Sequence, residues 1–81
     1  MIHYTAVLKK QLSDNVLLFD LRAINDDMST SIVVGFVIVN VISNGNVKSF
    51  VEGCDEVCSY KQILKKQCEE MAKEIVKVIQ P

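Results

Sequence analysis

The stretch from Ser31 to Ile42 constrains the fold more than any other part of the chain. Almost every side chain in it is β-branched or aromatic, a composition that suits a pleated, buried surface. Successive side chains of a strand point to opposite faces, and here both faces are apolar. The stretch therefore predicts a strand that needs apolar contact on each of its two sides.

Three further segments predict strands. Apolar side chains alternate or cluster, as they do in strands, over residues 2–9 and 16–24. A returning strand is predicted over residues 47–51, after Asn44-Gly45. Asn-Gly between two such runs is typical of a tight hairpin, because both central positions of a type I′ turn need positive φ. Polar residues separate the other runs at 13–15 and 25–30. This order predicts an antiparallel meander with short connections.

The last third of the chain predicts one amphipathic helix. Apolar residues recur there every three or four positions, the spacing that places them on one helical face. They are Val57, Tyr60 or Lys61, Leu64, Cys68, Met71, Ile75 and Val78, widened by Ile63, Ala72, Val76 and Ile79. Either Asp55 or Ser59 is a suitable residue to cap the start, and with Ser59 the side chain of Gln62 closes a capping box.

These elements predict an α+β fold: an antiparallel sheet of three to four strands, packed on one face by the C-terminal helix. The 81 residues predict a single domain spanning 1–81. On the sheet we expect the face of Leu17, Phe19 and Leu21 to form the core. On the helix we expect Leu64, Met71 and Ile75 to face the sheet.

Charge and targeting signals are weak. The formal net charge is −1, which produces no strong field for nucleic acid or an anionic membrane. Residues 1–10 lack the basic start and apolar run of a secretory signal. The longest apolar stretch, residues 32–39, is far shorter than the roughly 20 residues of a membrane helix. We interpret the protein as cytoplasmic.

The three cysteines are better explained as reduced thiols than as a metal site. Cys54 and Cys58 have a spacing that zinc sites use, and Cys68 lies in the helix. Structural zinc needs four ligands, and the fourth would have to be His3 or an acid such as Asp55 or Glu56. We expect no metal, no cofactor and no disulfide.

No arrangement of residues predicts catalysis. His3 is the only histidine, and a surface position explains it without a partner. Asp26 and Asp27 lie together in a polar loop, where solvation is their ordinary state. The chain has no nucleophile elbow and no glycine-rich phosphate loop. A small enzyme with a site shared between subunits is the weakest of the hypotheses, and we expect no enzymatic activity.

The surplus apolar surface leads to the functional hypothesis. One helix covers one face of a sheet, so the strand from Ser31 to Ile42 retains an apolar row, and such patches typically mark association surfaces. We expect a protein-interaction module, such as a regulator, inhibitor or assembly accessory protein, that forms a homodimer or binds a protein partner. Candidate interface residues are Ile32, Val33, Val34, Phe36, Val37, Ile38 and Val39. The alternative is nucleic-acid binding through the lysine-bearing helix, residues 61–77.

Overall fold

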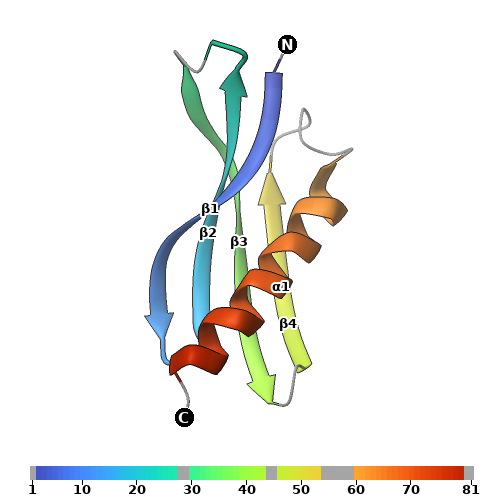
Figure 1. The fold of residues 1–81 in the computed structure, drawn as a ribbon. Coiled ribbons are helices and arrows are strands. Elements are labelled where there is room, and N and C mark those ends of the chain that lie inside the picture. The colour runs from blue at the N-terminus through green and yellow to red at the C-terminus, as the bar shows by residue number, and fades with distance from the viewer. Residues whose placement is uncertain (1, 28–29, 44–45, 54–59, 80–81) are drawn as a thin grey trace.

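A computed structural model describes residues 2–27, 30–43, 46–53 and 60–79. It contains four strands and one helix: β1 (Ile2–Ser13), β2 (Val16–Asn25), β3 (Ser31–Ser43), β4 (Asn46–Gly53) and α1 (Lys61–Ile79). The strands form one antiparallel sheet in the order β1-β2-β3-β4, and α1 lies across one of its faces (Figure 1). The predicted α+β meander with a C-terminal helix is confirmed.

The core lies between α1 and the middle of the sheet. Strand alternation points Leu17, Phe19 and Leu21 of β2 toward the helix, and all three are fully buried. Register places Val37 of β3 opposite Phe19 and Val39 opposite Leu17, so both valines share that face and are also fully buried. The predicted core face of β2 is therefore confirmed.

The helix packs on the sheet through a narrow stripe of four residues, Leu64, Cys68, Ala72 and Val76, spaced four apart. Residues at this spacing lie one above another on a single helical face. Leu64 is buried in the stripe, as expected, whereas Ile75 packs beside the stripe and is half-buried, not fully buried as expected. The expectation for Met71 is wrong, because its side chain is 37% exposed at the flank of the helix. Ala72 and Cys68 occupy the centre instead, since small side chains let the helix approach the sheet closely.

Hydrogen bonds at two places hold neighbouring elements together. The Asn15 side chain, in the turn between β1 and β2, donates to Asn40 Oδ1 at 3.1 Å and to the Val41 carbonyl at 3.0 Å. The Val41 amide donates back to the Asn15 carbonyl at 2.8 Å. On the helix side of β4, the Ser49 hydroxyl donates to the Glu69 carboxylate. These contacts secure the β1–β2 turn against β3 and the helix against β4.

Gly35 allows β4 to approach β3 closely at the point where β4 ends. It pairs with Gly53, the last residue of that strand. A Cβ atom built on Gly35 would overlap the carbonyl oxygen of Glu52 and lie 2.8 Å from Cα of Gly53. The obstacle is backbone, which cannot rotate away as a flexible side chain would. Past this point, among the described residues, the sheet continues with β1, β2 and β3 (Figure 1).

Several sequence predictions concern residues outside the described ranges. The hairpin at Asn44-Gly45 is one of them, and the helix caps at Asp55 or Ser59 are another. Within the described ranges, no helix combines the length and apolar character that crossing a bilayer requires.

The helix assignment predicts a clear difference between two substitutions. Leu64→Ala removes a side chain that is only 4% exposed and should lower the free energy of unfolding by roughly 2–5 kcal/mol. Met71→Ala removes a partly exposed side chain and should cost about 1 kcal/mol or less. Chemical denaturation of both variants measures the difference. Equal losses would show that Met71 packs in the core.

The close approach at Gly35 predicts that Gly35→Ala destabilises the fold. The added methyl group forces a backbone shift in β4, which should cost roughly 1–3 kcal/mol. Val33→Ala, two residues away at a side chain 53% exposed, is the matched control and should cost less than about 1 kcal/mol. Thermal unfolding followed by circular dichroism provides the comparison. A Gly35→Ala variant as stable as the parent would contradict this close packing of the two strands.

Candidate interaction surface

The face of the sheet opposite α1 carries a row of apolar side chains, which we call the open face. Alternation along each strand puts there the residues that do not point at the helix. Strand register joins Leu18, Ile38 and Phe50 in one line across β2, β3 and β4. The apolar members of the open face include Val7, Leu18, Val33, Phe36, Ile38 and Phe50.

These side chains retain much contact with solvent. Val33 is 53% exposed and Phe50 is 55% exposed, while Phe36 and Ile38 are half-buried by their neighbours. The rings of Phe36 and Phe50 lie 6.1 Å apart in a tilted arrangement, within the range in which aromatic pairs attract. Leu18, Phe36, Ile38 and Phe50 thus adjoin one another across β2, β3 and β4, whereas Asp20 lies between Phe36 and Val7.

A break in strand register decides which residues of β3 belong to this face. Leu21 of β2 pairs with Gly35, but the next residue, Arg22, pairs with Val33, so Val34 is an extra residue in β3. An extra residue reverses the alternation on its two sides. Val33 therefore shares the open face with Phe36 and Ile38, although strict alternation would have placed it on the other side.

The structure separates the seven candidate interface residues into three groups. Val33, Phe36 and Ile38 lie on the open face. Val37 and Val39 are fully buried beneath α1 and are part of the core, so they are unavailable to a partner of the folded chain. Val34 packs against the core, and Ile32 pairs with Ala23 on the helix side. Leu18, Phe50 and Val7 were absent from the candidates because only strand register shows that they share this face: Leu18 and Phe50 lie beside Ile38, and Val7 lies beyond Asp20 of β2.

Charged groups of both signs border the open face. A shallow hollow of about 380 Å³ lies there. It is lined by Lys9, Leu18, Asp20, Val33, Gly35, Phe36 and Ile38. Arg22 Nη1 lies 3.8 Å from Asp20 Oδ2, and Arg22 Nε donates to the Ser31 hydroxyl at 2.8 Å. The apolar surface is therefore bordered by a mixture of positive and negative charge.

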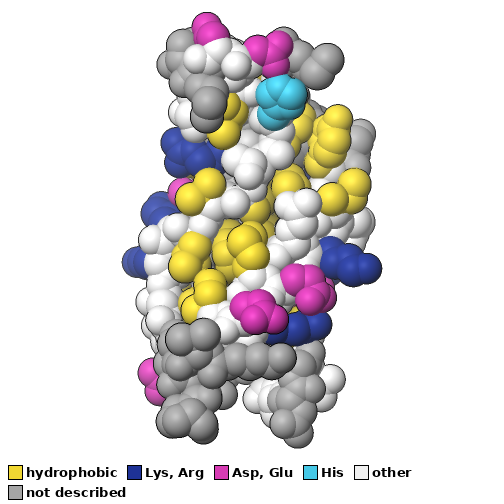
Figure 2. Space-filling view, in the orientation of Figure 1, with side chains coloured by type: hydrophobic (Ala, Val, Ile, Leu, Met, Phe, Trp, Pro, Cys, Tyr) yellow, Lys and Arg dark blue, Asp and Glu magenta, His cyan; other side chains and the backbone are white. Residues whose placement is uncertain are grey.

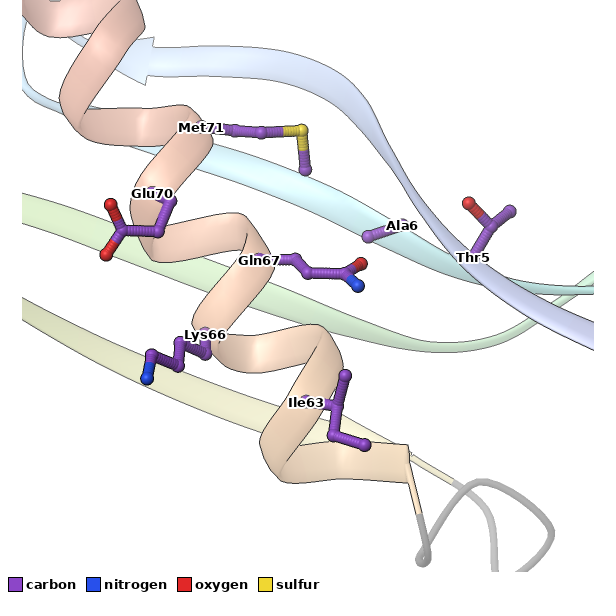
Figure 3. Close-up of a pocket in the computed structure, with 7 residues that line it drawn as sticks. All are labelled: Thr5, Ala6, Ile63, Lys66, Gln67, Glu70 and Met71. Atoms are coloured by element: carbon purple, nitrogen blue, oxygen red, sulfur yellow. The ribbon is translucent and has the colours of Figure 1, made fainter.

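A second apolar depression lies on the helix side, between α1 and β1. It has a volume of about 620 Å³, and hydrophobic side chains gather along the middle of this side of the molecule (Figure 2). Gln67 and Met71 reach from the helix toward Ala6 on β1 (Figure 3). The β1 side of this groove is lined by the small side chains of Thr5 and Ala6.

The residues considered for chemistry are dispersed. Cys68 is a buried free thiol within the helix stripe, whereas Cys54 and Cys58 lie outside the described residues. His3 Nε2 lies 2.7 Å from Asp26 Oδ1, so His3 does have a partner, and both side chains are exposed. Among the described residues, no three histidine, cysteine, aspartate or glutamate side chains converge on a point where a metal ion would bind.

Comparisons of this chain with protein-family models, with curated proteins and with solved structures found no match. The surfaces themselves are therefore the basis for inferring function. They define the class of protein as a small α+β meander with one covered and one open sheet face.

The position of Cys68 predicts an unreactive thiol. Burial, followed by the nearby Glu69 carboxylate, raises the pKa of Cys68 well above its ordinary value, to about 12. Because the thiolate is the reactive form, a variant retaining only Cys68 should react with a disulfide reagent at pH 8 only after denaturation. The raised pKa also means that the folded state should lose stability as pH rises from about 9 toward about 12. Rapid labelling of the native protein would contradict this position.

Proposed function

We propose that this protein is a non-enzymatic interaction module that binds another protein through the open face of its sheet. The observation that supports the proposal is the continuous apolar row across β2, β3 and β4, which none of the described residues covers. Fully burying a side chain of this size stabilises a complex by about 1.5–3 kcal/mol. Val33 and Phe50, each about half exposed, retain a large part of that free energy for a partner.

The chemistry of the surface favours a protein as the partner. An apolar centre with a mixed rim of charge resembles the usual anatomy of protein–protein interfaces. Lys9 and Arg22 supply positive charge there, and Asp20 and Glu52 supply negative charge. A polyanion or an anionic bilayer would instead favour a surface of predominantly positive charge.

The alternative function, binding of nucleic acid, would depend on the lysines of α1. On this helix glutamates interrupt the series of lysines, and Lys73 Nζ lies 3.3 Å from Glu70 Oε1. Neutralising neighbours weaken the field that would attract phosphate groups. Binding to generic RNA or DNA with a steep dependence on salt concentration would favour this alternative over the open face.

Neighbouring residues of β3 allow the proposal to be tested with one kind of substitution. Val37→Lys places an unpaired charge in the core and should destabilise the fold by more than about 3 kcal/mol. Ile38→Lys changes a half-buried side chain on the open face. The long lysine stem can carry its charge to solvent, so the cost should stay below about 2 kcal/mol. Thermal unfolding of both variants checks the assignment of the two faces.

The same open-face substitution tests binding. A photo-crosslinking benzoyl-phenylalanine at Phe36 should yield a discrete protein adduct in native extract, and Ile38→Lys should abolish that adduct without unfolding the protein. Tyr60 is the matched aromatic control, because it lies on the helix side against Tyr4, with ring centroids 5.1 Å apart. Equal adducts from both positions, or an adduct at Phe36 that is insensitive to Ile38→Lys, would refute the proposed function.

A further inference from the structure

The two edges of the sheet differ in regularity. Along β1, register shifts follow Leu8 and Gln11, and lysines stand at positions 9 and 10. Irregularities and edge lysines are ways in which proteins prevent unwanted strand pairing. The pairing of β4 with β3 has no register shift between the Gly35–Gly53 pair and the Val41–Val47 pair. The β4 edge is therefore regular over most of its length.

The outer edge of β4 has no neighbouring strand among the described residues (Figure 1). Backbone N–H and C=O groups along such an edge are available for pairing with another strand. The strand is eight residues long, Asn46–Gly53, which is an ordinary length for a strand in a sheet. The contact of Ser49 with Glu69 holds β4 beneath α1, so the edge is supported by the packed part of the molecule.

The charges on β4 are ordered in a way that complements a second copy of the same strand. On the open face, Lys48, Phe50 and Glu52 follow one another at alternate positions, and all three are exposed. A two-fold axis normal to the sheet at Phe50 brings Phe50 opposite its own copy. The same axis places Lys48 of each copy opposite Glu52 of the other. If the two strands slide past each other by one step of the register in either direction, Lys48 no longer lies opposite Glu52 at either end.

We propose that β4 pairs with β4 of a second copy, antiparallel about Phe50, so that two four-stranded sheets join into one. Opposite-charge and aromatic pairs directly across antiparallel strands are stabilising, and isologous two-fold contacts are the commonest form of self-association. The inference goes beyond the open-face proposal, because it uses the edge of the sheet. Pairing through β4 leaves most of the open face of each copy uncovered and places the two open faces side by side.

Charge reversal tests the pairing. Lys48→Glu and Glu52→Lys each replace two attractive pairs in the dimer with two repulsive ones, so each should weaken dimerisation roughly tenfold to a hundredfold. The double variant restores complementary pairs and should return the dimer dissociation constant to within about threefold of the parent. Sedimentation equilibrium at low ionic strength measures all four proteins. Lys10→Glu, the same charge change on the exposed β1 edge, is the control and should have no effect.

Mixing the two single variants gives a second, independent test. The glutamate introduced at position 48 of the first variant then faces the lysine introduced at position 52 of the second, and the native pair of Lys48 with Glu52 forms at the other end. An isotope-labelled Lys48→Glu protein mixed with unlabelled Glu52→Lys should therefore form a heterodimer, visible by native mass spectrometry, where each alone is mainly monomeric. Both residues are exposed, so circular dichroism should show unchanged folding.

Three results would overturn the inference: a parent protein that is monomeric at millimolar concentration, single variants that dimerise as well as the parent, or a double variant that is not rescued. The crosslink at Phe36 separates this outcome from the open-face proposal. If that adduct contains a different protein and persists in Lys48→Glu, the open face binds a partner irrespective of the β4 edge.

Discussion

The structure depends on one packing contact, that of the α1 stripe with the middle of the sheet. Leu64, Cys68, Ala72 and Val76 lie over the fully buried Phe19 and its neighbours on β2 and β3. A chain of 81 residues buries a smaller fraction of its surface than a large domain does, so its margin of stability is small. Removing any large member of this contact therefore threatens the whole fold, and the remaining features of the molecule are consequences of where the helix sits.

A single helix can cover only one face of a sheet, and here the central strand β3 is apolar on both faces. Here it buries Val37 and Val39 and leaves Phe36 and Ile38 in partial contact with water. It also leaves the groove beside β1 unfilled. Both apolar surfaces thus have the same cause, a sheet larger than the single helix can enclose. The open face carries an apolar row that crosses three strands, and for that reason it carries the functional proposal.

The edges of the sheet add a second level of organisation. Irregular register at Lys9 and beyond disfavours pairing on the β1 side, whereas β4 stays regular and presents its charges in self-complementary order. A dimer through β4 would place the two open faces next to each other. In that arrangement the apolar surface presented to a partner would be doubled, and the affinity for an extended or two-fold symmetric partner would rise through multivalent contact.

Local patterns in the amino-acid sequence were sufficient for the four strands, their order, the helix and the core face of β2, because these depend on alternation, turn chemistry and helical periodicity within short segments. These local patterns did not predict that Val34 is an extra residue in β3. The extra residue reverses the alternation and places Val33 on the open face. The extra residue is defined by how β3 pairs with β2, and the alternation pattern of one strand holds no information about that pairing. They also misplaced Met71, since apolar residues span a wide sector of α1. The close approach of helix and sheet selected the small side chains of Cys68 and Ala72 for the centre.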